Sequence, residues 1–176
     1  MSEKKNLPTI QELHHDITEA FKTDQLNLLL NQPVPTSWIK AHPFAKGVNY
    51  IPIERVEYML TKIFGEWRVE VKREGQMFNS VYVCVRLHYK NPTTGEWQFH
   101  DGLGAVGVQT DKGASASDLS AIKQDAIMKA LPAAESYAVK DAAEKLGKLF
   151  GKDLNRKDVI EFSPTFEKPK VEKVYE

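Results

Sequence analysis

The first third of the chain has a pattern of hydrophobic residues that predicts two helices. Thr9 and Glu12 fit a capping box, in which each side chain accepts a hydrogen bond from the other residue's backbone N–H. Apolar residues then recur at spacings of three and four, which predicts an amphipathic helix up to about residue 22. In "PIERVEYMLTKIFG", Pro52 favours a helix start and Gly65 a helix end. The two apolar faces contain Ile10, Leu13, Ile17 and Phe21, and Ile53, Val56, Leu60, Ile63 and Phe64.

After Gly65 the pattern changes from the period of a helix to the period of strands. Residues 67–72 alternate between apolar and charged side chains, which predicts a half-buried strand that ends at a turn, "REGQ". A second strand is predicted over 81–90, and "NPTTG" (91–95) has the proline and glycine typical of a hairpin. "EWQFHDGLGAVGVQ" continues as a third strand interrupted by glycines. Because short turns join these strands, they are predicted to form an antiparallel meander.

A long helical region is predicted over about 118–151. Pro132 divides it and should cause a kink or a restart, because proline lacks the N–H that a helix interior uses. After Pro132, small and apolar residues recur every four positions, so this part of the helix should pack closely on the sheet. The stripe consists of Ala134, Ala138, Ala142, Leu146 and Phe150, with Leu149 beside it.

At 176 residues, the chain is long enough for one domain with a substantial core. The predicted fold class is α+β: an antiparallel β-meander of three or more strands packed on a long C-terminal helix, with shorter N-terminal helices. This domain is expected over 9–158, after a disordered tail at 1–8. Residues 159–176 contain prolines and many charges and are expected to form a flexible tail.

The composition is typical of a soluble globular protein, with 41% hydrophobic and 27% charged residues. The N-terminus lacks the apolar segment of a secretory signal, and no apolar stretch is long enough to span a bilayer. The single cysteine, Cys84, excludes an internal disulfide and a cysteine-based zinc cage. A cytoplasmic protein without membrane contacts is therefore expected.

The net charge is zero, which argues against a uniformly basic protein, but the charges are unevenly distributed. Between residues 144 and 157 the chain has five basic residues against two acidic ones, an excess of three. Lys145, Lys148 and Lys152 lie at i, i+3 and i+7 and are predicted to share one helix face. Two interpretations stay open: a solvated helix surface, or a row of cations that follows the phosphates of a single strand.

The segment "GLGAVG" (102–107) fits the G-x-G-x-x-G fingerprint of dinucleotide-binding proteins through Gly102, Gly104 and Gly107. That fingerprint works where a strand turns tightly into a helix whose N-terminus holds the pyrophosphate. Here "VQTDKG" follows, which is not a helix start. We therefore predict that the glycines bend the strand or admit another backbone at close range. A small nucleotide-binding enzyme that uses this segment is the alternative.

The sequence shows no convincing catalytic constellation, so an enzyme is not expected, and neither is a cofactor. It has no G-x-x-x-x-G-K-[ST] loop and no clear spacing of serine, histidine and aspartate. His88 and His100 would face each other across the 91–95 hairpin with Asp101 nearby. A metal site at this pair and ordinary surface histidines are the two interpretations.

Three stretches, in this order, carry a resemblance to a known family. "YIPIERVEYMLTKIFGEWRVEV" has a tyrosine-led short helix, a phenylalanine-glycine, a tryptophan and a strand. "VYVCVRLHYKNPTTGEWQFHDGLGAVGV" is a strand–turn–strand that ends in glycines, and "ESYAVKDAAEKLGKLFGKDLNRKD" is a helix with Ala-Val-x-Asp, basic positions and Phe-Gly. Over about 38–158 the chain resembles the Rad-fifty-two family of single-strand annealing proteins, which includes phage recombination proteins.

The resemblance implies that subunits assemble into rings or helical arrays, with a single DNA strand in a basic groove and its bases outward. Annealing then needs neither ATP nor a metal. By position, Lys145 and Lys148 match helix residues that grip the DNA backbone, and Lys40 matches another cation of the groove. Glu144 stands where the family has a basic residue, so the groove would depend more on Lys152 and Arg156. Lys152 is included because of its helix spacing from Lys145 and Lys148, and not because of the resemblance.

Lys90 and Lys129 match a second, outer DNA site. The partners that the resemblance implies are single-stranded DNA, further copies of the chain, and a phage exonuclease or a host single-strand binding protein. Ring closure needs a head-to-tail interface, for which strand edges and "LNLLL" (26–30) are candidates, although this segment also fits an ordinary core. A structural or RNA-binding domain of similar fold is a further alternative.

Overall fold

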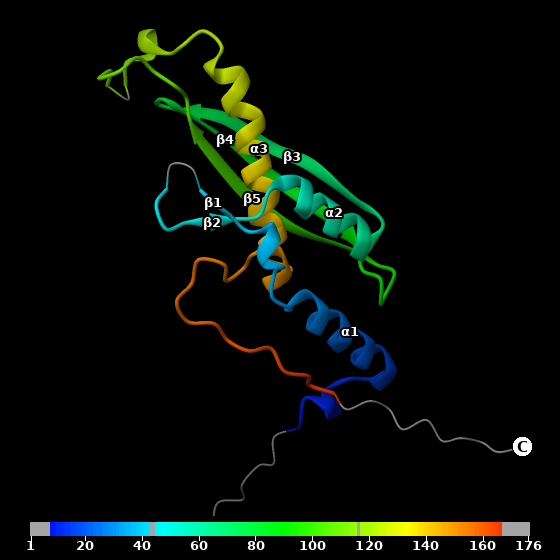
Figure 1. The fold of residues 1–176 in the computed structure, drawn as a ribbon. Coiled ribbons are helices and arrows are strands. Elements are labelled where there is room, and N and C mark those ends of the chain that lie inside the picture. The colour runs from blue at the N-terminus through cyan, green and yellow to red at the C-terminus, as the bar shows by residue number, and fades with distance from the viewer. Residues whose placement is uncertain (1–7, 43–44, 116, 167–176) are drawn as a thin grey trace, which may run out of the picture.

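The computed structural model describes residues 8–42, 45–115 and 117–166 (Figure 1). Three long strands, β3 (Trp67–Met77), β4 (Ser80–Lys90) and β5 (Trp97–Gly107), form an antiparallel sheet in the order β3–β4–β5. Helix α3 (Ala126–Glu144) packs across one face of this sheet, beside the shorter helix α2 (Ile53–Phe64). The predicted α+β meander on a C-terminal helix is confirmed.

The core lies between the sheet and α3. Along β4, alternate residues are buried because one face of this central strand meets the helix. On the helix, Ala134, Ala138 and Ala142 have no exposed surface, which confirms the predicted alanine stripe. Phe150 and the α2 residues Val56 and Leu60 complete the same cluster. The buried residues of β4 are Val81, Val83, Val85, Leu87 and Tyr89.

Two glycines of β5 let α3 approach the sheet closely. A Cβ atom on Gly104 would lie 2.0 Å from the carbonyl oxygen of Ala134, and one on Gly102 would lie 2.0 Å from that of Ala138. β5 continues through the whole 102–107 segment in unbroken register with β4. The glycines therefore admit a backbone, as predicted, but they neither interrupt the strand nor lead into a helix.

The first hairpin differs from the prediction. "REGQ" belongs to β3, which pairs with β4 as far as Met77 opposite Ser80, and the turn falls at Phe78 and Asn79. A register shift between Val71 and Arg73 marks a β-bulge in this strand. Cross-strand pairing with the valine-rich β4 outweighs the local turn signal of Gly75.

The N-terminal helix also begins later than predicted. The capping box forms, with a 2.7 Å bond from the Thr9 N–H to the Glu12 carboxylate, but it closes only a short 3₁₀ turn at Gln11–Leu13. The α1 helix (Ile17–Leu30) starts where Asp16 accepts hydrogen bonds from two backbone N–H groups. The predicted apolar face is wrong at its start, because Ile10, Leu13 and Ile17 are exposed.

The predicted long helix is shorter at both ends. α3 starts at Ala126 after a 3₁₀ turn, η3 (Leu119–Ala121), and continues through Pro132 without a restart. It ends at Glu144 and is followed by a second 3₁₀ turn, η4 (Lys148–Phe150). A small hairpin of β1 (Lys40–Ala41) and β2 (Asn49–Tyr50) lies on the β5 side of α3 (Figure 1).

After η4 the chain returns toward α1 (Figure 1). The backbone N–H groups of Thr165 and Phe166 donate to the buried carboxylate of Asp24, at 2.8 and 3.2 Å, and Phe166 is buried. Thr165 and Phe166 of the predicted tail thus make defined contacts with α1. Residues 1–7 and 167–176 of the two predicted tails lie outside the described residues. Within the described ranges, no helix is long and apolar enough to cross a membrane.

Candidate nucleic-acid interface

The predicted basic helix face is interrupted by Gly147. This residue has φ 154° and ψ −175°, a conformation open to glycine, and a Cβ atom there would lie 2.4 Å from the carbonyl oxygen of Leu30. The close approach of α1 therefore ends α3. As a result, Lys145 caps α3, Lys148 begins η4 and Lys152 lies in the following turn, so the prediction that they share one helix face is wrong.

The two lysines that the family resemblance singles out are both in ion pairs. Lys145 lies 3.0 Å from Asp141, whose carboxylate also accepts the Leu103 N–H at the free edge of β5. Lys148 is largely buried, contacts Asp153 at 3.5 Å and donates to the carbonyl of Ile160. Lys148 is therefore held by the chain's own groups, whereas Lys145 stays half exposed.

Three other predicted cations are differently placed. Among the described residues, no carboxylate lies within ion-pair distance of Lys40, Lys152 or Arg156, and all three are exposed. The Asn155 side chain joins the turn to the β1–β2 hairpin: its Oδ1 accepts the Asn49 N–H at 2.7 Å and its Nδ2 donates to the Asn49 carbonyl at 2.9 Å. This contact brings Arg156 beside the hairpin that carries Lys40.

A hollow of about 200 Å³ lies at this junction, between β2, α3 and the turn after η4. Tyr50 and Tyr137 line it, and the Lys140 ammonium lies 5.0 and 4.5 Å from their ring centroids. His42 adds a third ring, 5.9 Å from that of Tyr50. Sequence reasoning missed Lys140 and Tyr137, although their spacing of three on a helix places them on one face. Rings and cations together are what single-strand binders use.

Two charged groups of this hollow have shifted pKa values. Partial burial raises the pKa of Glu144, and the neighbouring carboxylate of Asp141 raises it further. Partial burial lowers the pKa of Lys140, while Glu144 acts in the opposite direction. The hollow therefore lies in a partly desolvated environment, and Glu144 supplies a negative charge there that becomes neutral as the pH falls.

The two residues predicted for an outer DNA site lie at opposite ends of the molecule. Lys90 ends β4 opposite Trp97 and contacts Glu66 at 2.7 Å. Lys129 lies in the first turn of α3, near the other end of the sheet, in an ion pair with Asp125. The structure does not bring these two lysines together.

The histidine pair does not form a metal site. His88 pairs with Phe99 on the face of the sheet away from α3, whereas His100 pairs with Leu87 on the α3 face. His88 lies 3.0 Å from Glu70, and His100 shares a hydrogen bond with Tyr89. Strand alternation thus separates the two rings, and no group of three metal-ligating side chains occurs among the described residues.

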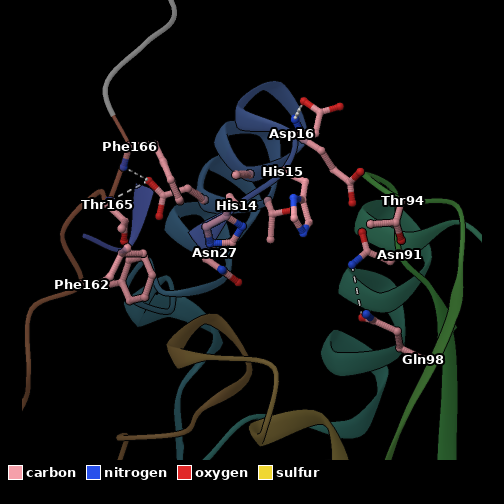
Figure 2. Close-up of a pocket in the computed structure, with 15 residues that line it drawn as sticks. His14, His15, Asp16, Asn27, Asn91, Thr94, Gln98, Phe162, Thr165 and Phe166 are labelled. Atoms are coloured by element: carbon pink, nitrogen blue, oxygen red, sulfur yellow. Dashed lines mark hydrogen bonds between the residues drawn. The ribbon is translucent and has the colours of Figure 1, made fainter. Parts of the chain in front are cut away.

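A larger cavity, of about 610 Å³, lies between α1, the β4–β5 hairpin and the C-terminal segment (Figure 2). His14 and His15 come from the turn before α1, and His14 meets the ring of Phe166 edge-on at 5.1 Å. On the opposite wall, Asn91 donates to Gln98 at 3.2 Å. The predicted DNA-contact residues are not part of this cavity.

No protein-family model matches the chain, and no curated protein matches it either. The resemblance carried by the three sequence stretches accordingly stays a prediction.

Proposed function

We propose that this protein binds single-stranded DNA and anneals complementary strands without ATP, as a homo-oligomeric ring or helical array. The observation that carries this proposal is the junction of the β1–β2 hairpin with the turn after η4. There, three exposed cations without carboxylate partners among the described residues lie next to residues that line a hollow with two tyrosine rings, either in the sequence or across the β1–β2 pairing. The three cations are Lys40, Lys152 and Arg156.

In this proposal, the cations neutralise phosphates and release the counterions bound to them. The free energy of binding then comes largely from counterion entropy, and log K falls with log salt by about 0.7 for each phosphate contact on a single strand. Tyr50 and Tyr137 provide faces on which a base or sugar can rest without sequence preference. Lys145 can join the contacts by exchanging Asp141 for a phosphate, since its pair is exposed and weak.

Annealing follows if the strand is held by its backbone while its bases stay accessible to a complement. One subunit has few such contacts, so a track of neighbouring subunits is needed to hold the strand by avidity. A subunit with zero net charge can build that track by aligning local basic faces. The order of sheet and helix agrees with the one that the family resemblance implies. The same resemblance implies a phage exonuclease or host single-strand binding protein as partners, and we propose a cytoplasmic location, as expected from the composition.

The test is a salt titration of oligo-dT binding by fluorescence anisotropy. Lys152→Ala with Arg156→Ala should lower the affinity at least tenfold and reduce the salt slope by about 1.4, the loss of two phosphate contacts. A matched control, Lys22→Ala with Lys123→Ala, removes two exposed cations outside the site and should change neither quantity.

The wild-type protein should also anneal complementary oligonucleotides without nucleotide or metal. Wild-type affinity and slope in the Lys152/Arg156 variant would disprove the site but not the function. If the wild-type protein ignores oligo-dT in dilute buffer, the function is wrong. Binding to oligo-U without annealing activity would favour an RNA-binding domain instead.

A further inference from the structure

The face of the sheet opposite α3 has no covering element among the described residues. Gly104 faces α3, so its neighbours Leu103 and Ala105 face the other way. Leu103 is 68% and Met77 62% exposed, which is unusual for large apolar side chains on one surface. A hollow of about 480 Å³ lies here. It is lined by Arg73, Met77, Tyr82, Cys84, Leu103, Gly104 and Ala105.

A second apolar surface lies on the first half of α3. The helix turns Ala126, Ala130 and Ala134 toward the core, and these three are buried. Met128 and Leu131 lie on another face of the helix and are exposed, Met128 at 79%. Glu135 follows Met128 and Leu131 at i+7 and i+4, so the three residues form one exposed stripe.

The first half of α3 and the last part of β5 lie at the same end of the molecule, one in the helical layer and one in the sheet (Figure 1). Gly104 contacts the backbone of Ala134, which places the first half of α3 over the end of β5. The hollow occupies the other face of the same strand end. A copy of the chain stacked on the sheet face can therefore meet the hollow with its own α3.

The charges of the two surfaces are complementary. Arg73 lines the hollow and Glu135 ends the α3 stripe, and in the described part of the chain neither has an ion-pair partner. A phosphate backbone would fit the hollow less well, since its charge would be buried against Met77 and Leu103. The apolar stripe of α3 meets those side chains without that cost.

We propose that this is the subunit interface: Met128 and Leu131 of one copy enter the hollow of the next copy, and Glu135 pairs with Arg73. Because the two surfaces differ, the contact is heterologous and repeats head to tail, giving a ring or a helical array and not a closed dimer. The inference deepens the proposed function and rests on it, since that function requires an assembly. It assigns the residues that build the assembly.

Cys84 provides a direct test, because it lines the hollow and is the single cysteine of the chain. Met128→Cys places a second thiol on the opposite surface. A short bismaleimide added without DNA should then produce a covalent ladder of dimers, trimers and larger species. The wild-type protein and Met128→Cys with Cys84→Ser have one thiol each and should give no ladder. Absence of a ladder in Met128→Cys, or a ladder that stops at the dimer, overturns the proposal.

Charge reversal tests the same interface without a chemical cross-linker. Arg73→Glu and Glu135→Arg should each convert the assembly to monomers at micromolar concentration, measured by analytical ultracentrifugation, and the double variant should restore it. Both positions are exposed, and circular dichroism confirms that the variants fold. A wild-type monomer, or single variants of wild-type size, refutes the interface. Because these measurements contain no DNA, they test the interface separately from the function. An array that assembles through these surfaces but does not bind oligo-dT would refute the proposed function and leave the interface standing.

Discussion

At the scale of single residues, Glu144 has the clearest effect on the proposed site. Its carboxylate lies near Lys140 and Lys145 at the C-terminal end of α3, at a position where the resembled family has a basic residue. Its pKa is raised, first by partial burial and then by Asp141. If DNA binds at the proposed site, the ionised group repels its phosphates at neutral pH. As the pH falls through the raised pKa, the group becomes neutral, so binding of single-stranded DNA should strengthen.

Glu144→Gln should therefore bind oligo-dT about two- to fivefold more tightly at pH 7, as expected for removing an exposed charge interaction of roughly 0.5–1 kcal/mol. The ratio of variant to wild-type affinity should shrink toward one between pH 7 and pH 5. Histidines, His100 included, are common to both proteins and cancel in this ratio. Anisotropy titrations across that pH range provide the measurement. A ratio that stays constant with pH would show that Glu144 does not face the DNA.

The effect of pH on stability runs in the same direction as its effect on DNA binding: a lower pH favours both. A carboxyl whose pKa is higher in the folded than in the unfolded chain contributes stability at low pH, and this contribution is lost as the pH rises through the folded pKa. Glu144→Gln should accordingly keep or increase the free energy of unfolding at pH 7. If Glu144→Gln binds DNA more tightly and is no less stable, Glu144 acts as a repulsive charge at the proposed site and has no structural role.

At the scale of elements, the contact between β5 and α3 depends on glycine. A Cβ atom at position 104 would lie 2.0 Å from the Ala134 carbonyl oxygen and 2.5 Å from the Ala138 nitrogen, both backbone atoms of the helix. Gly104→Ala must push α3 away from the sheet and should lower the free energy of unfolding by about 3 kcal/mol or more. Gly107→Ala is the matched control, since a Cβ atom there meets nothing within 4 Å. It should change stability by less than about 0.5 kcal/mol in urea denaturation.

The elements also show what local sequence can predict. Strict alternation predicted β4, and the alanine stripe predicted the face of α3, because burial on one side imposes a period. The predicted ends of helices and strands were wrong where contacts with a segment distant in the sequence determine them. The 3₁₀ turn at η4 depends on the Leu30 carbonyl beside Gly147, 117 positions along the sequence, and the end of β3 depends on its pairing with β4.

The same reason limited the prediction of the site. Composition located the basic segment, but the pairing of Lys148 with Asp153 required coordinates. The i, i+4 pair of Lys145 with Asp141 was within reach of helix periodicity but was not predicted. The link between Asn155 and Asn49 joins residues 106 positions apart, so no local pattern could place the turn that carries Arg156 against the β1–β2 hairpin. Tyr137 and Lys140 were within reach of helix periodicity, but their partner Tyr50 was not.

At the scale of the whole molecule, the proposed DNA groove and the proposed interface lie on different parts of the subunit. The groove is built at the C-terminal end of α3, and the interface uses its N-terminal half. This arrangement lets each copy keep its cations exposed while it is joined on both sides. In the proposed array, binding would multiply weak contacts, so that a chain of zero net charge could hold a polyanion.

A mixing experiment tests this arrangement. Leu103→Asp places a carboxylate in the hollow and leaves the α3 stripe intact, whereas Met128→Asp blocks the stripe and leaves the hollow intact. Both side chains are exposed, so both variants should fold, and each alone should be a monomer. An equimolar mixture should form a one-to-one dimer and nothing larger, because only one hollow and one stripe remain functional. Mass photometry distinguishes this dimer from the wild-type array.

The dimer should also bind oligo-dT more weakly than the array, because avidity along the strand is reduced to two subunits. If the mixture regains the wild-type size, the two surfaces are not the ones that join the copies. If it stays monomeric while the wild-type protein assembles, the hollow and the stripe do not meet each other. A dimer that binds DNA as tightly as the array would instead show that two subunits supply the whole binding energy, and the requirement for a longer continuous track would be lost.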